Sequence, residues 1–513
     1  MTAFLSALAG GFLLSLTFPP VGFNFLAWVA FIPLFWSLSM TGHPGRSFLC
    51  GFLFGFGFFL ADLSWIYNTL ITHGHFSPVA GVAVFLGMIG FLSLYPGVFG
   101  FVMGFFSGKG ISSVQAAPFI WIAQEYMRSE LFTGFPWDLV GYSQAGRLIV
   151  VQAADLTGVY GISFLVLLVN AALWELLRPK IEEDRISWKL IAAAGLAVVL
   201  VLSYGNARLK QFSSTHAGLD NFTTGVLQGN IPQEVKWEDA SRQQTFAVYE
   251  RLGREAVEQG AELLIWPETS VPVVFGGRDQ DWMLPGLISE RLGVPMLVGA
   301  PSKRKVNNEI SYYNSAFLID SRMLRFRYDK MHLVPFGEYM PWSWILPLGP
   351  GLAAREADYS AGKTMTVMHW KDCPPFSVLI CYEAIFPELA RLGIQDGAKW
   401  LVNITNDGWF GDTAAPYQHM AMAGVRSVEN RVWLLRAANT GISAAFDPSG
   451  RSLRSIPLQQ EGFFTVKVGE TAAQKSFYSR FGDVFAWGCV GITLFLGFST
   501  MGFRRRGRLW KRN

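Results

Sequence analysis

The sequence predicts a multi-pass α-helical membrane bundle joined to an α/β domain. Only 16% of the 513 residues are charged, whereas about 25% is usual for soluble domains. Residues 1–210 hold most of the apolar sequence, and a second apolar stretch with a basic tail begins at residue 484. Between them, residues 222–468 alternate strand-like and helix-like segments. The uneven charge and the two kinds of periodicity therefore predict two structural classes in one chain.

Eight apolar runs have lengths near the roughly 20 residues that a helix needs to cross a bilayer. They cover residues 2–18, 21–40, 47–71, 79–106, 114–132, 159–177, 187–205 and 484–503. The first run lacks a basic leading segment and a clear small-residue cleavage site, so we expect a retained span rather than a signal peptide. The predicted organisation is a seven-span domain (1–210), a soluble domain (220–470), an eighth span (484–503) and a basic tail (504–513).

Lysine and arginine residues predict the orientation of the spans. The second, fourth and sixth gaps between spans are basic, the first and third carry neither residue, and the fifth has Arg147 alone, with Arg128 at its membrane edge. By the positive-inside rule, both termini are expected in the cytoplasm. Seven spans then place the soluble domain on the opposite face, the periplasmic face of a bacterial inner membrane. The basic residues on the predicted cytoplasmic side are Arg46, Lys109, Arg178, Lys180, Arg185, Lys189, Arg504, Arg505, Arg506, Arg508, Lys511 and Arg512.

Four polar residues fall at predicted membrane depth: Asp62, Asn68, Gln124 and Glu125. Intramembrane acids often have a function, but hydrogen bonding between helices explains them equally well. The sequence leaves the roles of Asp62 and Glu125 open. A transporter with an accessory domain is disfavoured, because intramembrane charge is scarce and no inverted repeat is evident.

The soluble domain has the pattern of an α/β fold. Strands are predicted at 223–228, 262–266, 295–298, 313–319, 324–328, 376–380, 400–403, 432–437, 442–446 and 462–468, and helices at 243–259, 282–292, 386–394 and 417–430. Helices alternating with strands imply βαβ units, and the late run of strands implies antiparallel pairing. In such sheets, functional sites gather beyond the carboxyl ends of strands.

Three predicted strands end in a reactive side chain, namely Glu268, Lys330 and Cys381. Each alone is a weak signal, since a lone cysteine is most often buried for packing and exposed charges are common. Together they form a complete set for acyl transfer. Glu268 can act as general base and acid, Cys381 as nucleophile and Lys330 as a fixed cation for an oxyanion.

Cys381 is expected at a turn between a strand and a helix. The positive end of a helix favours the thiolate, so this position predicts a lowered thiol pKa. The backbone N–H of Tyr382 is the natural second donor to an oxyanion.

The segments that carry these residues resemble the Glu-Lys-Cys motifs of the nitrilase (carbon–nitrogen hydrolase) superfamily. They are Trp266-Pro-Glu268, Tyr328-Asp-Lys330-Met-His-Leu-Val-Pro-Phe-Gly-Glu338 and Cys381-Tyr-Glu383, supported by Gly229-Asn-Ile-Pro-Gln233 with Lys236-Trp237, Tyr312-Tyr-Asn-Ser315 and Asn403-Ile-Thr-Asn-Asp407-Gly-Trp-Phe-Gly411. With a membrane bundle before this domain and one span after it, essentially the full chain resembles the bacterial apolipoprotein N-acyltransferase family.

The resemblance implies an αββα sandwich and a catalytic triad of Glu268, Lys330 and Cys381. It also implies supporting roles for Glu338, Tyr382 and Glu383, and a substrate contact for Trp237. The implied reaction is ping-pong. A membrane phospholipid acylates the cysteine, and the N-terminal diacylglyceryl-cysteine of an apolipoprotein then accepts the acyl chain.

An apolar, charge-free loop at residues 342–352 contains Trp342 and Trp344. Exposed apolar patches mark membrane or ligand contacts, so we expect a mobile lid whose tryptophans contact the lipid substrate. An internal loop packed in the core is the alternative.

Other chemistries remain less favoured. His332 or His419 could form a Cys–His pair, although neither has a clear third partner in the sequence. Water could replace the amine acceptor, which would make the protein a membrane-tethered amidohydrolase. No metal-ligand spacing and no phosphate-binding loop appears, so we expect no metal and no cofactor. The net charge of +4 gives no sign of a nucleic-acid partner, and a monomer is the simplest expectation.

Overall fold

The computed structural model describes residues 1–109, 111–178, 186–215, 222–233, 239–276, 282–306, 308–340, 358–469 and 475–509. The chain forms two compact units. The first comprises Met1–Tyr67, Ser77–Arg208 and Phe481–Asn513, and the second comprises Asn68–Phe76 and Leu209–Arg480. Each unit is described separately below.

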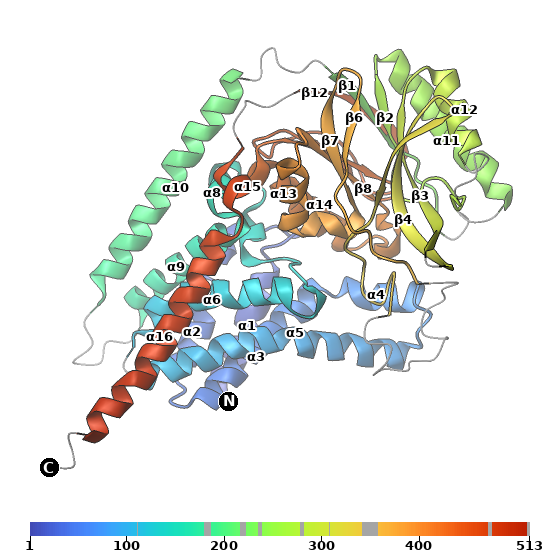
Figure 1. Cartoon of the computed structure of the whole chain (residues 1–513). Coiled ribbons are helices and arrows are strands. Elements are labelled where there is room, and N and C mark those ends of the chain that lie inside the picture. Colours follow the sequence, from blue (N-terminus) through green and yellow to red (C-terminus); the bar gives the residue numbers. More distant parts are fainter. Residues whose placement is uncertain are drawn as a thin grey trace. The chain divides into compact units, whose positions relative to one another are not determined.

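The first unit is helical (Figure 1). Its helices, including those that continue into the second unit, are α1 (Thr2–Ser15), α2 (Ile32–Ser39), α3 (Pro44–Asp62), α4 (Trp65–Thr72), α5 (Pro78–Ser107), α6 (Ser113–Glu130), α7 (Leu148–Val151), α8 (Ala154–Thr157), α9 (Val159–Leu177), α10 (Trp188–Thr215), α15 (Phe477–Phe481) and α16 (Val484–Leu509). Short 3₁₀ segments η1 (Asn24–Trp28), η2 (Leu131–Thr133) and η3 (Val140–Gln144) connect them.

Within the described residues, four helices are long and apolar enough to cross a membrane. They are Pro44–Asp62, Pro78–Ser107, Val159–Leu177 and Trp188–Phe212. Other apolar helical stretches, at Thr2–Ser15, Asn24–Ser39, Leu148–Thr157 and Val484–Ser499, are shorter. The apolar run 47–71 is divided between α3 and α4, because α3 ends at Asp62. The predicted count of eight crossings therefore stays a prediction, whereas a helical, membrane-type region is confirmed.

Glu125 takes part in the packing of the first unit. Its Oε1 accepts hydrogen bonds from Nε1 of Trp121 at 2.9 Å and from the backbone N–H of Val140 at 2.8 Å. One turn further along α6, Arg128 donates to the carbonyl oxygens of Phe135 and Trp137 at 3.0 and 2.8 Å. These bonds tie the segment that follows α6 back onto the helix and satisfy buried polar groups, as a bundle interior requires.

The second unit contains two six-stranded sheets (Figure 1). The first has the order β12-β1-β2-β3-β4-β5, and the second has the order β11-β10-β9-β8-β7-β6. The first sheet consists of β1 (Phe222–Gln228), β2 (Leu263–Ile265), β3 (Met296–Val306), β4 (Glu309–Asp320), β5 (Met323–Asp329) and β12 (Gly462–Val468). The second consists of β6 (Val367–Trp370), β7 (Cys373–Ile380), β8 (Trp400–Thr405), β9 (Trp433–Ala438), β10 (Ser443–Phe446) and β11 (Ser452–Ile456).

Both sheets have a parallel centre flanked by antiparallel strands. β1, β2 and β3 pair in parallel, as do β7, β8 and β9. The other pairs are antiparallel. The parallel strands place their carboxyl ends at one edge of each sheet, which is where α/β proteins build their sites.

Helices cover the outer face of each sheet. α11 (Asp239–Glu258) and α12 (Met283–Leu292) pack on the first sheet, and α13 (Pro387–Gln395) and α14 (Ala415–Asn430) pack on the second (Figure 1). The two sheets contact each other through β1 with β9 and β10, and through β4 with β7. The hydroxyl of Ser443 donates to Oε1 of Gln228 at 2.6 Å across this interface. The layers therefore run helix, sheet, sheet, helix.

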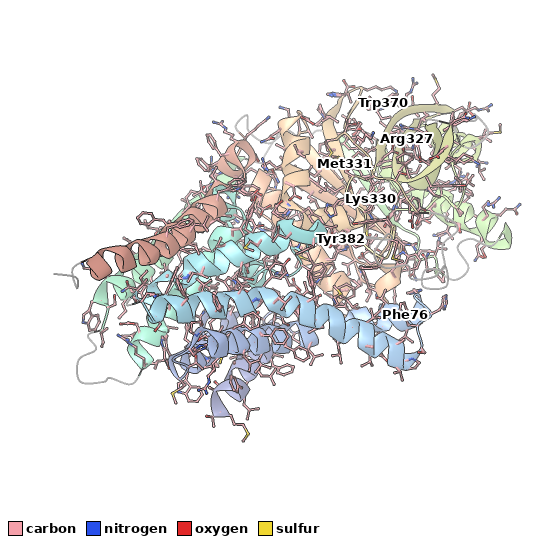
Figure 2. The ribbon with its side chains drawn as sticks, turned by 60° about the horizontal axis from the view of Figure 1, so that its bottom comes forward. Phe76, Arg327, Lys330, Met331, Trp370 and Tyr382 are labelled. Carbon is pink, nitrogen blue, oxygen red and sulfur yellow. The ribbon has the colours of Figure 1, made fainter. Side chains whose placement is uncertain are left out.

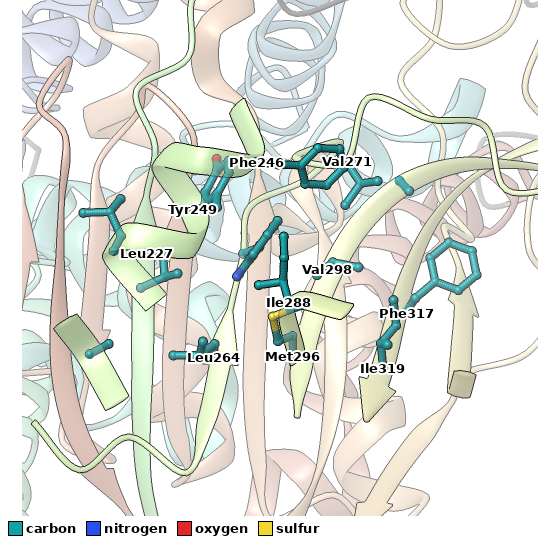
Figure 3. Close-up of a cluster of buried hydrophobic side chains, with 14 of the residues drawn as sticks. Leu227, Phe246, Tyr249, Leu264, Val271, Ile288, Met296, Val298, Phe317 and Ile319 are labelled. Carbon is teal, nitrogen blue, oxygen red and sulfur yellow. The ribbon is translucent and has the colours of Figure 1, made fainter. Parts of the chain in front are cut away.

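A buried apolar cluster fills the space between the first sheet and its helices (Figure 3). Tyr249 of α11 stacks on Trp266, with ring centroids 4.5 Å apart. Both side chains are fully buried. Because Trp266 directly follows β2, this stacking fixes the chain where it leaves the sheet. The cluster includes Leu227, Phe246, Leu264, Val271, Ile288, Met296, Val298, Phe317 and Ile319.

Candidate active site

The three predicted reactive residues all lie just beyond strand ends of the second unit. Glu268 follows β2, Lys330 follows β5 and Cys381 follows β7. All three are buried, with exposed fractions of 5%, 1% and 7%. The charges of Glu268 and Lys330 both act on the Cys381 thiol. The fold thus brings a carboxylate, an amine and a thiol into one electrostatic environment.

Glu268 is held by two donors from other elements. Its Oε1 accepts from the side-chain amide of Asn314 at 2.7 Å, and its Oε2 accepts from the backbone N–H of Asn406 at 2.8 Å. Gly299 of β3 allows this approach, since a Cβ there would lie 2.6 Å from Cα of Glu268. The carboxylate is therefore fixed on both oxygens.

Lys330 lies between two carboxylates. Its Nζ is 2.8 Å from Oε2 and 3.0 Å from Oε1 of Glu338, and 3.8 Å from Oε1 of Glu268. Burial disfavours the ammonium, but Glu338, Glu268 and Cys381 outweigh burial and raise the pKa of Lys330. Lys330 is thus a permanent cation in the site. It lies with Met331 just beyond β5 (Figure 2).

Asn314 and Glu338 complete the carboxylate–amine arrangement. The amide of Asn314 donates to Oε1 of Glu338 at 2.8 Å as well as to Glu268. The backbone N–H of Val334 donates to Oε2 of Glu338 at 2.8 Å. Glu338 is therefore in direct contact with Lys330, and the supporting role that the resemblance implied for it stays a prediction. Asn314 and Asn406 lie in two segments that the sequence analysis quoted as supporting the resemblance, but no role was predicted for either residue.

Cys381 begins a 3₁₀ segment, η4 (Cys381–Ile385), and α13 starts only at Pro387. Its φ is +52°, a left-handed value that costs a non-glycine residue about 1–3 kcal/mol. Burial raises the pKa of the Cys381 thiol, Glu268 raises it further, and Lys330 only partly opposes them. The expectation of a lowered thiol pKa is wrong, because burial and a nearby carboxylate outweigh the end of a short helical segment. The resting cysteine is a protonated thiol that needs a base.

Glu383 joins the segment after Lys330 to the segment that contains Cys381. Its Oε1 accepts from the backbone N–H groups of Met331 and His332 at 2.7 and 3.2 Å and from the hydroxyl of Tyr328 at 2.8 Å. Its Oε2 accepts from the backbone N–H of Ile380 at 2.7 Å. Burial raises the pKa of Glu383 to about 7, although the surrounding donors and Lys330 oppose the shift. This carboxylate fixes two strand ends relative to each other.

Tyr382 is buried in an aromatic group beside the thiol. Its ring centroid is 5.0 Å from that of Phe386 and 5.8 Å from that of His332. The His332 ring stacks on Phe386 at 3.7 Å. These contacts hold the side chains on both sides of Glu383 in place. The direction of the Tyr382 N–H is then set by the conformation of the preceding residue, Cys381.

The side chains of His419 and His332 contact groups other than the Cys381 thiol, so the structure does not support a Cys–His pair. His419, on α14, uses Nε2 to contact the carbonyl oxygen of Cys381 at 3.1 Å and Nδ1 to contact Asp407 at 3.1 Å. Both of its ring nitrogens are therefore engaged by groups other than the thiol, and the His332 ring is stacked. Among the described residues no group of His, Cys, Asp or Glu could hold a metal ion.

Three predicted substrate contacts lie outside the described residues. These are Trp237, Trp342 and Trp344, and the whole loop 342–352 lies there with the last two. They stay predictions from the sequence.

Comparison with known proteins relates both units to one family. The family model for the apolipoprotein N-acyltransferase N-terminal domain matches residues 10–172, and that for carbon-nitrogen hydrolase matches residues 223–475. An apolipoprotein N-acyltransferase from Geobacter metallireducens is 38% identical over 509 residues, which cover 98% of this chain and 96% of that protein. Another from Methylococcus capsulatus is 33% identical and covers 99% and 97% of the two chains. The crystal structure of an amidase from Nesterenkonia sp. has 20% identity and a TM-score of 0.37, covering 49% of this chain and 92% of that one.

Proposed function

Because the chain belongs to the apolipoprotein N-acyltransferase family, we propose that it moves a fatty acyl chain from a phospholipid to a lipoprotein through a thioester on Cys381. The acceptor is the α-amino group of an N-terminal diacylglyceryl-cysteine. The observation that carries this mechanism is that Glu268, Lys330 and Cys381 are all buried just beyond strand ends, with Nζ of Lys330 3.8 Å from Oε1 of Glu268. The charges of Glu268 and Lys330 both act on the Cys381 thiol. Covalent catalysis suits a reaction that must accept two bulky lipids in turn.

In the first half-reaction, Glu268 removes the Sγ proton of Cys381, and the thiolate attacks the ester carbonyl carbon of the phospholipid. The tetrahedral oxyanion is stabilised by Nζ of Lys330 and by the backbone N–H of Tyr382. Collapse breaks the bond from the acyl carbon to the glycerol oxygen. Glu268 then returns its proton to that oxygen, and a lysophospholipid leaves.

In the second half-reaction, the α-amino group of the acceptor attacks the thioester carbonyl. Glu268 takes a proton from the attacking nitrogen, and the acyl–sulfur bond breaks as the amide forms. The proton passes to the departing sulfur, which restores the thiol. Glu338 keeps Lys330 oriented through both steps, because it holds the ammonium at 2.8 Å.

The membrane region supports a reaction between membrane-held lipids. We propose eight crossings, both termini in the cytoplasm and the second unit on the periplasmic face of a bacterial inner membrane. A domain tethered on both sides to the bilayer keeps its site close to both lipid substrates, which raises their effective concentration. Trp237, Trp342 and Trp344 contact lipid in this proposal, and the protein acts as a monomer without a cofactor.

The mechanism is tested by the intact mass of the purified protein after incubation with phospholipid vesicles. Wild type is expected to gain the mass of one fatty acyl chain, and the adduct is expected to disappear when a diacylglyceryl-cysteine peptide is added. Cys381→Ala should gain no mass. Cys373→Ala is the matched control and should behave as wild type, since Cys373 lies at the other end of β7.

Two outcomes would contradict the proposal. Acylation of the peptide without any adduct on the enzyme would exclude the thioester. Discharge of the adduct by water alone, and not by the peptide, would make the protein an amidohydrolase-type enzyme.

A further inference from the structure

A buried polar network lies beside Cys381. Two of its side chains contact the backbone carbonyl of Cys381, and a third, that of Thr405, hydrogen-bonds the thiol. The carbonyl oxygen of Cys381 accepts from Nε2 of His419 at 3.1 Å and from the side-chain amide of Asn403 at 3.5 Å. His419 and Asn403 are each fully buried, and they come from α14 and β8. Two different elements, a strand and a helix, thus converge on one carbonyl group.

The direction of this carbonyl determines the direction of the next N–H. In a trans peptide the C=O and N–H bonds point to opposite sides of the peptide plane, and among the described residues the one cis bond is Pro19–Pro20. Holding the Cys381 carbonyl toward His419 therefore aims the Tyr382 N–H away from the network. The left-handed φ of Cys381 makes this restraint necessary, because the residue would otherwise relax to a commoner conformation.

His419 is itself held by charged partners. Nη2 of Arg436 lies 3.1 Å from Nδ1 of His419 and 2.6 Å from Oδ2 of Asp407. Asp407 Oδ1 also accepts from the hydroxyl of Thr405 at 3.0 Å. Because a carbonyl can only accept, Nε2 of His419 carries a proton. Nδ1 lies 3.1 Å both from Oδ1 of Asp407 and from Nη2 of Arg436, so this ion pair holds the other side of the ring. Burial and Arg436 lower the pKa of His419, whereas Asp407 and the Cys381 carbonyl oppose the shift.

From this geometry we infer that His419 is a positioning residue for the acyl transfer. It holds the Cys381–Tyr382 peptide plane so that the Tyr382 N–H serves as an oxyanion donor. Asp407, Arg436 and Asn403 fix the histidine and the same carbonyl. This inference rests on the proposed reaction through Cys381, but it assigns a role to residues that do not touch the reacting atoms.

The test compares two reactions of the same thiol in the full-length protein. Cys50, Cys373 and Cys489 are first replaced, so that Cys381 is the only one of the four cysteines left. The first reaction is single-turnover acylation by phospholipid vesicles, which passes through an oxyanion. The second is modification by methyl methanethiosulfonate, in which the thiolate displaces methanesulfinate from sulfur, so that no carbonyl reacts and no tetrahedral oxyanion forms at carbon. A loss confined to the first reaction separates oxyanion stabilisation from general damage to the thiol.

The decisive variants are His419→Met and His419→Gln, which have similar volume but differ in the side-chain N–H donor. His419→Met is expected to slow acylation about 100-fold, the usual effect of losing one oxyanion donor, while thiosulfonate modification changes less than about threefold. His419→Gln should recover most of the acylation rate, because its amide can donate to the Cys381 carbonyl. His369→Gln, at an exposed position on β6, is the matched control and should leave both rates unchanged.

Several results would overturn the inference. Unchanged acylation in His419→Met would remove any role for the histidine, and an equal fall in both reactions would reduce that role to general packing. If the methionine variant does not fold, Asn403→Asp takes its place, since it loses the amide donor to the same carbonyl and must show the same selective loss. Absence of acylation in wild type would instead refute the proposed function.

Discussion

The carboxylate of Glu383 accepts the backbone N–H of Met331 at 2.7 Å, although 52 residues separate the two in sequence. Met331 directly follows Lys330, and Glu383 lies two residues after Cys381. This bond connects the first sheet to the second at the point where each delivers a reactive side chain. The amine and the thiol thereby share one rigid support.

Replacing Glu383 by glutamine should destabilise the second unit. Each carboxylate oxygen accepts from backbone N–H groups, and the NH₂ group of glutamine must face a donor at one of them. A buried unsatisfied donor costs about 1–3 kcal/mol. We expect a lower midpoint of thermal unfolding for Glu383→Gln and no change for the exposed control Glu258→Gln. Equal midpoints for Glu383→Gln and wild type would show that the amide finds new partners.

Removing the charge of Glu268 and removing that of Lys330 should change the rate of Cys381 thiol modification in opposite directions. Glu268→Gln removes a charge that raises the thiol pKa, whereas Lys330→Met removes one that lowers it. At a fixed pH below the thiol pKa, each unit of pKa shift changes the thiolate fraction about tenfold. Methyl methanethiosulfonate should therefore modify Glu268→Gln faster and Lys330→Met more slowly than wild type.

Both variants should nevertheless lose acyl transfer, because one lacks the base and the other lacks the cation for the oxyanion. General acid–base catalysis contributes about 10²–10⁴-fold, so losses of this order are expected. Slower thiosulfonate modification of Glu268→Gln would mean that its carboxylate does not raise the thiol pKa. The background for both measurements is the variant with Cys381 as the only cysteine.

Gly299→Ala should reduce the activity of the protein and also lower its thermal stability. The added methyl group would lie 2.6 Å from the backbone of residues 267–269 and push the Glu268 segment away from β3. Small misplacements of a catalytic group cost up to about 10²-fold in rate. Single-turnover acylation measures the effect, and the circular dichroism spectrum should stay unchanged. Gly462→Ala is the control, since its new methyl group would make only ordinary contacts.

Asp407 should make a pH-dependent contribution to stability. Burial alone would raise its pKa, but Arg436 and His419 lower the pKa to about 2. A depressed carboxylate pKa stabilises the fold above the ordinary value of about 4, and this contribution is lost as the pH falls toward 2. Removing one partner of a buried ion pair costs about 3–5 kcal/mol. The midpoint of thermal unfolding of Asp407→Asn should therefore be well below that of wild type at pH 7, and this difference in midpoint should become smaller below pH 4. A difference in midpoint that stays constant down to pH 2.5 would contradict this.

Replacing Trp342 and Trp344 together by alanine should impair turnover of vesicle lipid. The sequence around them is apolar and free of charge, which is typical of a segment that contacts lipid. The matched measurement uses a short-chain, water-soluble ester, whose turnover should fall much less. Equal turnover of vesicle lipid in the variant and wild type would remove these residues from lipid binding.

The sequence predicted the central strands well, because each is a short apolar run buried on both faces. It missed β6 and β11, which are the two edge strands of the second sheet. Four of the five residues of β11 are exposed, so no apolar pattern marks it. The periodicity of the apolar run 47–71 also could not reveal the break after Asp62, since both sides of it are equally apolar.

The positions of Glu268, Lys330 and Cys381 beyond strand ends were predictable from the sequence, but the electrostatics around them were not. Lys330 and Cys381 are found at strand ends, as the sequence implied. The thiol pKa depends on burial and on Glu268, which lies 113 residues earlier in the chain. The double contact of Asn314 to Glu268 and Glu338 likewise arises only when strands and loops of distant sequence meet.

The proposed base and nucleophile follow strands of different sheets, Glu268 a strand of the first and Cys381 a strand of the second. The alignment of Glu268 with Cys381 therefore depends on the contact between the two sheets and not on either sheet alone. On slow heating, a shift of one sheet against the other would inactivate the enzyme before either sheet unfolds. Loss of activity should therefore precede the loss of secondary structure. Substitutions that strengthen the contact between the two sheets, at positions away from the site, would raise the temperature at which the enzyme loses activity.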